Sequence, residues 1–121
     1  MIRAAHLELL PKLRKRGIRV IPGGDYGFAH NPIGRNAWDA ELFVKDYGYT
    51  SSEVLRAMTQ YGGQMMGMGD ELGLVKEGYL ADLLVIDGDP TADITVLQQR
   101  ERFKVIMQEG KFYKNIGSEP R

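Results

Sequence analysis

The chain has 121 residues, and its sixteen lysines and arginines are balanced by sixteen aspartates and glutamates. Hydrophobic residues make up 43% and charged residues 26%, which is typical of one globular domain and excludes a disordered chain. Zero net charge gives no electrostatic basis for binding nucleic acid or an anionic membrane, and the absence of cysteine excludes disulfides, thiol nucleophiles and cysteine-ligated zinc.

The N-terminal part of the chain predicts a helix, a short strand and a glycine-rich loop. Leucines at a spacing of three predict a helix over residues 4–16, with basic residues in its last turn, as at a solvated helix end, and Gly17 as its terminating glycine. Pro11 lies inside this stretch, so the helix either begins near it or bends there. Residues 18–21 predict a β-strand, and Gly23 and Gly24 after it predict a sharp turn or a close approach of the backbone to another group.

Two further helices are expected next. Apolar residues at helical spacing predict a helix over residues 37–47, which Gly48 ends. Thr50, with Glu53 three residues later, has the form of a capping box and starts a second helix. We expect this second helix to end at Gly62 and Gly63.

After Gly73 the pattern becomes that of β-structure. The apolar run at residues 80–86 predicts a strand buried on both faces. Residues 93–97 predict a short helical turn, and residues 103–107 and 111–113 predict a β-hairpin that turns at Glu109 and Gly110. Asp82 and Asp87 flank the first strand and are expected to serve turns or backbone amides, not a metal. The polar tail at residues 117–121 is expected to fray.

Few side chains in this sequence can carry chemistry. Asp25 directly follows the predicted strand at residues 18–21, and α/β folds place ligands at the carboxyl ends of strands. The alternative for Asp25, which spacing alone favours, is an Asx turn that satisfies the backbone. His30 lies in the same loop and is a weaker candidate for chemistry. His6, on the first helix, is expected to be a surface or packing residue.

Four segments of the chain resemble the metal-dependent amidohydrolase superfamily, and one of them, residues 105–107 with Gly110 and Lys111, looks like the family's closing hairpin. Residues 17–25 resemble the last barrel strand of that family, written there as GVRVALGTD or close to it. The segment that includes Thr50 and Glu53 resembles the helices that follow in the imidazolonepropionase- and prolidase-like branch. Residues 72–87 resemble the LGxIxxGxxADLVxxD segment, in which the family's chain leaves the barrel and enters a small β-sandwich.

The resemblance implies an α+β fold made of two parts in one folding unit. Residues 1–70 would be the last strand and the following helices of a (β/α)₈ barrel, and residues 71–121 would be the C-terminal strands of the β-sandwich. A complete barrel takes about 250 residues, so we expect a truncated chain that self-association completes. Its partner would be a second copy, giving a homodimer, or a complementary chain that contains the rest of the barrel. We expect a cytoplasmic protein with no nucleic-acid or membrane partner.

The resemblance also assigns the candidate site residues. Asp25 matches the family residue that binds metal and takes a proton from the metal-bound water. His30 is a candidate substrate-binding residue, because many relatives carry a histidine where this chain has Ile33. The family's first-strand His-x-His pair, its middle-strand lysine or acidic bridge and its two further histidines have no counterparts here.

Two functions are therefore weighed. The parental reaction would be hydrolysis of a C–N bond in an amide, a cyclic amide or a dipeptide, with a divalent, zinc-like metal. The isolated chain is expected to hold no cofactor and to be inactive, because a catalytic zinc site needs about three protein ligands. The alternative is a non-catalytic module that self-associates or completes a partner's barrel.

Overall fold

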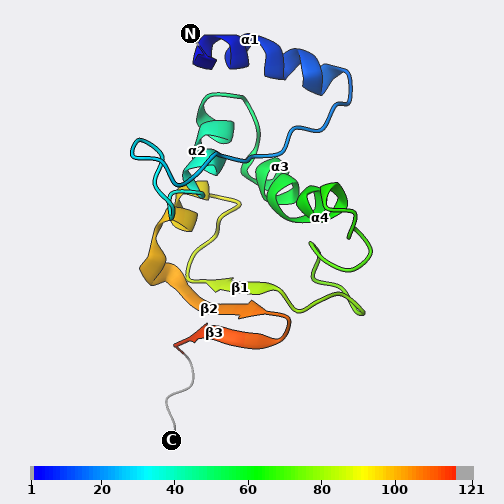
Figure 1. Ribbon diagram of the computed structural model, residues 1–121, viewed down its shortest axis with the longest axis vertical. Helices are drawn as coiled ribbons and strands as arrows, with labels where there is room; N and C mark the ends of the chain where they lie inside the picture. Colours follow the sequence, from blue (N-terminus) through cyan, green and yellow to red (C-terminus); the bar gives the residue numbers. More distant parts are fainter. Residues whose placement is uncertain (1, 117–121) are drawn as a thin grey trace, which may run out of the picture.

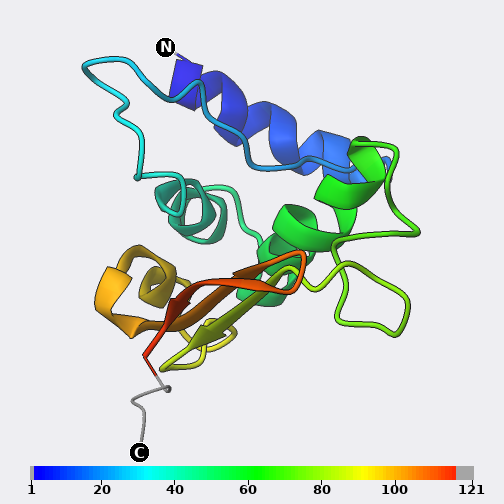
Figure 2. The same cartoon turned by 60° about the horizontal axis from the view of Figure 1, so that its bottom comes forward.

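The computed structural model describes residues 2–116, so the predicted fraying of residues 117–121 lies outside the described residues. The chain forms a small α+β fold, as predicted, in which α2, α3 and α4 lie between α1 and a three-stranded sheet (Figures 1 and 2). The elements in chain order are α1 (Ile2–Lys15), α2 (Trp38–Lys45), α3 (Ser51–Arg56), the π turn η1 (Ala57–Tyr61), α4 (Gly62–Met65), β1 (Leu83–Ile86), the 3₁₀ turns η2 (Ile94–Gln98) and η3 (Arg100–Arg102), β2 (Phe103–Gln108) and β3 (Lys111–Asn115). Within residues 2–116, no helix has both the length and the apolar composition needed to cross a bilayer.

Helix α1 runs through Pro11 and ends where the glycine was predicted to end it. Pro11 lacks an amide hydrogen, so one helical hydrogen bond is missing, but the helix neither begins nor stops there. Gly17 has a φ of +73°, and its amide donates to the Arg14 carbonyl at 2.9 Å. The next amide, of Ile18, donates to the Leu13 carbonyl at 3.1 Å, which completes a Schellman motif.

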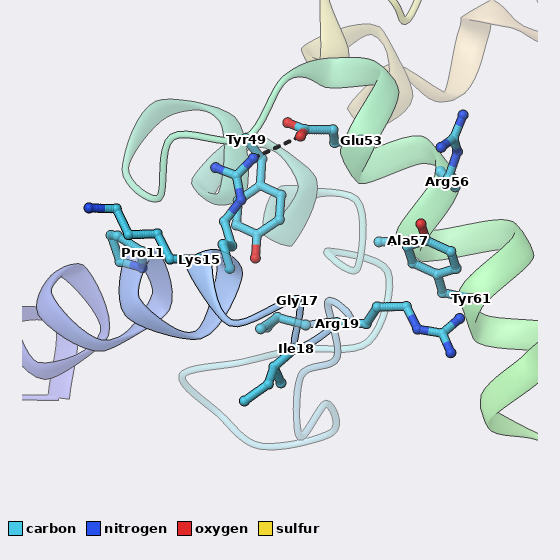
Figure 3. A pocket seen from close by; sticks show the side chains of 12 residues that line it. Pro11, Lys15, Gly17, Ile18, Arg19, Tyr49, Glu53, Arg56, Ala57 and Tyr61 are labelled. Atoms are coloured by element: carbon cyan, nitrogen blue, oxygen red, sulfur yellow. Dashed lines mark hydrogen bonds and ion pairs between the residues drawn. The ribbon is translucent and has the colours of Figure 1, made fainter.

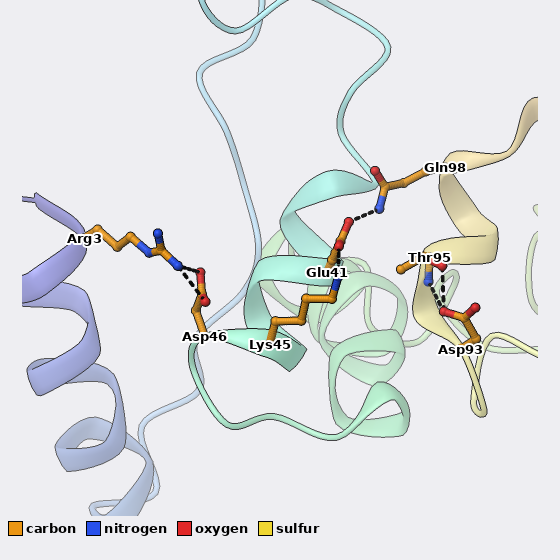
Figure 4. A network of polar contacts seen from close by, with 7 residues as sticks. All are labelled: Arg3, Glu41, Lys45, Asp46, Asp93, Thr95 and Gln98. Atoms are coloured by element: carbon orange, nitrogen blue, oxygen red, sulfur yellow. Dashed lines mark hydrogen bonds and ion pairs between the residues drawn. The ribbon is translucent and has the colours of Figure 1, made fainter.

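Polar side chains hold α1 against the C-terminal end of α2. Both carboxylate oxygens of Asp46 lie 2.8 Å from Nη2 of Arg3 (Figure 4). His6 lies edge-on to Tyr47, with Nδ1 at 3.4 Å from the Tyr47 hydroxyl. His6 is therefore a packing residue, as predicted.

The strand predicted at residues 18–21 is not formed. This segment is irregular and pairs with no strand in the described part of the chain. A strand needs a neighbour to satisfy its backbone amides and carbonyls. The three strands β1, β2 and β3 all lie beyond α2–α4 from this segment (Figure 1), so none of them can pair with it.

The helix that begins after Thr50 starts as predicted but runs further. Thr50 and Glu53 form both bonds of a capping box, at 3.2 Å from the Glu53 amide to Thr50 Oγ1 and 2.8 Å from the Thr50 amide to Glu53 Oε2. The predicted end at Gly62 is wrong, because the helix continues through η1 and α4 to Met65. Gly67, with a φ of +75°, ends it instead.

Two glycines let this helix and the following loop approach closely. A Cβ on Gly63 would lie 2.6 Å from the carbonyl oxygen of Leu72. A Cβ on Gly73 would lie 2.6 Å from the carbonyl oxygen of Thr59, and Gly73 also has a φ of +94°. Gly63 thus serves helix-to-loop packing, which explains why it does not end the helix.

The predicted hairpin is present as β2 and β3, and it extends the sheet in the antiparallel order β1-β2-β3. Its turn places Glu109 at a φ of +50° and Gly110 at +78°. The Asp82 carboxylate accepts a hydrogen bond from the Glu109 amide at 2.8 Å, and the Gly110 amide donates to the Ala81 carbonyl at 3.1 Å. The structural role predicted for Asp82 is therefore confirmed, and it connects the turn to the start of β1.

Strand β1 is shorter and more exposed than predicted. Leu84 and Val85 point to opposite faces of the sheet, and they are 56% and 52% exposed. The prediction of a strand buried on both faces is wrong, because neither face is fully covered at these positions. Asp87, at the end of β1, serves an ion pair rather than a backbone amide, with Oδ2 at 3.6 Å from Nζ of Lys104.

One apolar cluster joins the helices to the C-terminal part of the chain. Its buried members are Ala40, Phe43, Tyr49, Val54 and Ile94, and partly buried side chains from Val20, Val44, Tyr47, Leu55 and Leu97 pack around it. Ile94 belongs to η2, so the predicted helical turn is confirmed and supplies the sheet side of the core. Beside the cluster, Gln98 Nε2 donates to Glu41 Oε2 at 2.5 Å (Figure 4).

The close approach at Gly73 predicts a large cost for adding one methyl group. Gly78 is the matched control, because its φ is +83° but its Cβ position is open. Gly78→Ala should cost about 1–2 kcal/mol of unfolding free energy from the left-handed backbone alone. Gly73→Ala should cost about 1–3 kcal/mol more, because the methyl group meets backbone atoms that cannot rotate away. Urea denaturation of both variants measures the difference, and equal losses would contradict the packing role.

Candidate functional site

The loop between α1 and α2 brings the two predicted site residues to one pocket. This pocket has a volume of about 510 Å³. It is lined by Asp25, Phe28, His30, Asn31, Trp38 and Asp39. Asp25 and His30 therefore line one pocket, although the strand predicted to precede Asp25 is absent.

A tight turn in this loop places Asp25 and His30 together. The Gly27 amide donates to the Asn31 carbonyl at 2.9 Å, and the Asn31 amide donates to the Phe28 carbonyl at 3.0 Å. The Asn31 side chain donates to the backbone carbonyl of Asp25 at 3.1 Å. The His30 ring stacks on Phe28 with 6.2 Å between the ring centroids.

Tyr26 packs over the glycine that precedes the site. A Cβ on Gly24 would lie 2.4 Å from the Tyr26 ring, so the close approach predicted for this glycine pair is present at Gly24. The Tyr26 hydroxyl lies 3.5 Å from the Asn36 carbonyl, just before α2. Burial and the neighbouring Asp39 carboxylate raise the pKa of Tyr26 to about 12, while Arg35 opposes the shift.

The Asp25 carboxylate is available for chemistry. Within residues 2–116 it makes no hydrogen bond and no ion pair, and only its backbone carbonyl is used by the loop. The alternative role in an Asx turn is therefore not seen. An exposed, unpaired carboxylate at the edge of a pocket can accept a proton or bind a cation.

The residues of this pocket do not form a complete metal centre. Asp25, His30 and Asp39 are the residue types that bind divalent metals. No group of three or more such residues in the described part of the chain is close enough to hold an ion. This pocket thus offers Asp25 as an unpaired carboxylate, whereas a catalytic zinc needs about three protein ligands.

A second pocket was not predicted from the sequence. It has a volume of about 590 Å³ and lies between α1, residues 17–20 and the helix made of α3 and η1 (Figure 3). Its polar lining comprises Arg14, Lys15, Arg19, Tyr49, Glu53, Arg56 and Tyr61. The basic end of α1 has the sequence pattern of a solvated helix end, and only the fold shows that distant residues complete a cavity there.

Arg14 and Glu53 form the fixed part of this second pocket. Arg14 Nη2 lies 2.8 Å from Glu53 Oε1, and Nη1 donates to the Gly48 carbonyl at 2.7 Å. The Arg14 guanidinium also lies 4.0 Å from the centre of the Tyr49 ring. The backbone amide of Thr50, aided by Arg14, holds the pKa of Glu53 below its ordinary value.

A family model and the sequences of known proteins match this chain over most of its length. The model of the amidohydrolase family matches residues 1–113. The chain is 28% identical over 117 residues to ochratoxinase from Aspergillus niger, a match that covers 96% of this chain and 24% of that protein. It is 24% identical over 111 residues to imidazolonepropionase from Vibrio vulnificus, covering 92% of this chain and 27% of that protein.

Solved structures show the same relationship. The crystal structure of A. niger ochratoxinase matches with a TM-score of 0.79 at 26% identity, over 94% of this chain and 26% of that chain. A Xaa-Pro dipeptidase with bound methionine in the active site matches with a TM-score of 0.77 over 90% of this chain and 25% of that chain. Its identity is 24%, so it supports the fold alone. The chain therefore spans about a quarter of the length of the proteins it matches.

The environment of Tyr26 predicts that its hydroxyl loses its proton at a higher pH than an ordinary tyrosine does. The pKa of about 12 in the folded chain, against 10.0 for an ordinary tyrosine, means that the protonated hydroxyl contributes stability below pH 10. That contribution is lost as the pH rises from 10 toward 12. Titration followed by tyrosinate absorbance should show a late transition to which Tyr26 and Tyr49 both contribute, because both pKa values are raised. Tyr26→Phe should remove the Tyr26 part of its amplitude, and Asp39→Asn should shift that part to lower pH.

Tyr113→Phe is the matched control for this titration. Tyr113 is 69% exposed on β3, far from the loop, so its replacement should leave the late transition in place. Loss of the Tyr26 part in Tyr113→Phe, or an undiminished late amplitude in Tyr26→Phe, would show that Tyr26 does not pack as described.

Proposed function

The chain belongs to the amidohydrolase family, and from this we propose that it forms the C-terminal part of a hydrolase acting on C–N bonds in amides, cyclic amides or dipeptides. The predicted resemblance to the imidazolonepropionase- and prolidase-like branch is confirmed by the matches to imidazolonepropionase and to the dipeptidase fold. The matched proteins are about four times longer than this chain. We therefore do not ascribe the complete activities of these proteins to the 121 residues of this chain.

In this proposal, Asp25 is the active-site residue that the chain contributes. It lies in the pocket formed by the loop before α2 and the first residues of α2, and its carboxylate is unpaired within residues 2–116. Such a carboxylate can take the proton of an attacking water. His30, within the turn that Asn31 closes, lines the same pocket, where a substrate group would contact it.

The observation that carries the proposal is a family match over nearly the whole chain without a complete ligand set. Residues 1–113 match the family, yet residues 2–116 hold no group of three metal-binding side chains. We therefore propose that the isolated chain is inactive and binds no metal tightly. The remaining ligands would come from barrel strands outside these 121 residues.

A second function is that of a non-catalytic module which a partner covers. Large apolar side chains are exposed on several elements, including Ile33 at 80%, Met65 at 70% and Val75 at 89%. Strands β1 and β3 are both edges of the sheet, and each has an unpaired side. These features favour a second copy as the partner, with a barrel-containing chain as the alternative.

The incomplete ligand set predicts a specific result for metal and substrate. Calorimetric titration with zinc should detect no binding tighter than micromolar, and a panel of dipeptides and cyclic amides should show no turnover. A fusion that supplies the missing barrel from a relative should hydrolyse one member of the panel. In that fusion Asp25→Asn should abolish turnover, and Asp70→Asn, the same change on an exposed loop, should leave it unchanged.

One outcome would make the isolated chain an enzyme. Submicromolar zinc binding or turnover by the 121-residue chain, lost in Asp25→Ala, would contradict the proposal that other strands complete the site.

The open sheet edges predict self-association. Light scattering at micromolar concentration should give the mass of a dimer. Leu84→Lys, at an exposed position of edge strand β1, should shift the mass to that of the monomer. Leu9→Lys makes the same change on α1, at 49% exposure, and should leave the dimer intact. A monomer before any substitution would contradict the idea.

A further inference from the structure

The pocket beside α1 contains a buried hydroxyl with no partner. Tyr49 is 9% exposed and packs on Phe43 with 5.1 Å between ring centroids. Its hydroxyl oxygen is buried and has no hydrogen-bond partner in the described part of the chain. A buried hydroxyl without a partner is unfavourable, so such a group points to something that binds it.

This hydroxyl is a hydrogen-bond donor directed at the pocket. Burial is the main cause that raises the pKa of Tyr49, so the group stays protonated at neutral pH. In Figure 3 the Tyr49 hydroxyl points toward the segment of Gly17, Ile18 and Arg19. That segment and Tyr49 both line the pocket.

The pocket also has an excess of positive charge. Its lining includes the cations Arg14, Lys15, Arg19 and Arg56 and the single carboxylate of Glu53. Glu53 is already paired with Arg14 at 2.8 Å. Three cations therefore remain in a chain whose formal net charge is zero.

The remaining cations are distributed around the cavity. Lys15 and Arg56 lie on either side of Tyr49 (Figure 3), and neither has a hydrogen bond or an ion pair within residues 2–116. Arg19 lies 4.9 Å from the centre of the Tyr61 ring and donates to the side-chain carbonyl of Gln64. Both Lys15 and Arg56 have long side chains that can turn toward a ligand at the Tyr49 hydroxyl.

We propose that this pocket binds a small oxyanion, a phosphate or carboxylate group, with the Tyr49 hydroxyl donating at its base. Arg19 and the rim cations Lys15 and Arg56 neutralise its charge. Pro11, Ile18 and Val20 supply apolar walls for the rest of such a ligand. This site is separate from the Asp25 pocket and does not depend on the proposed hydrolase function.

A water molecule is the competing explanation for the Tyr49 hydroxyl. Water could accept its hydrogen bond, but water would not neutralise Lys15 and Arg56. The two explanations differ in one measurable property. Only an oxyanion site makes the stability of the chain depend on phosphate or carboxylate at constant ionic strength.

Thermal unfolding of the full chain tests the proposal. Melting temperatures are measured in sodium chloride, sodium phosphate and sodium succinate at matched ionic strength. Saturable stabilisation by phosphate or by succinate is expected, as for any ligand that binds only the folded state, and the two arms distinguish the anion type. Tyr49→Phe keeps the ring in the core, so it should fold and should weaken the apparent affinity about tenfold.

Two lysine variants show whether anion binding depends on the pocket or on the overall charge of the surface. Lys15→Gln should also weaken the affinity about tenfold, because it removes a charge-assisted contact. Lys12→Gln removes the same charge from the same helix outside the pocket and should leave the affinity unchanged. Equal stabilisation by chloride, phosphate and succinate would overturn the proposal. An unchanged affinity in Tyr49→Phe, or equal losses in the two lysine variants, would also overturn it.

Discussion

Burial of the small cluster around Val54 is the interaction on which the rest of the structure depends. Val54 and Ala40 are completely excluded from solvent, and Ile94 brings the C-terminal part of the chain into the same cluster. Within the described part of the chain, helix α1 contributes no residue to this cluster, and its Arg3 and Arg14 bind Asp46 and Glu53 beside it. Hydrophobic burial therefore fixes α2, α3 and η2 relative to one another, and directional contacts position the elements around them.

The small size of this core also explains where the pockets lie. The Asp25 pocket is built by a loop that is positioned by local contacts, such as the Tyr26 ring over Gly24 and the turn at Asn31. The second pocket opens where α1 diverges from the cluster and leaves the Tyr49 hydroxyl without a partner. The residues that line the Asp25 pocket are all exposed or partly buried, whereas the second pocket includes the buried Tyr49 and Ala57.

Local features of the fold could be predicted from the sequence, whereas features that depend on distant segments could not. The glycine end at Gly17, the Thr50 capping box and the hairpin turn at Gly110 each depend on a few adjacent residues, and all three are present. Strand formation at residues 18–21 depends on a neighbour that no local pattern reveals. The grouping of Asp25 with His30 follows from one loop, but the second pocket joins residues from 11 to 61.

Because of the π turn η1, the number of residues in this helix matters as much as their identity for the packing of the helix on the following loop. A π turn holds one residue more than an α-helical turn, so the residues after it are rotated by about 100° relative to a regular helix. That rotation directs Gly63 at the Leu72 carbonyl. Deletion of one residue within η1 would restore a regular helix and turn Gly63 away from the loop. This stretch therefore accepts changes of side chain more readily than insertions or deletions, a constraint on how the chain can diverge.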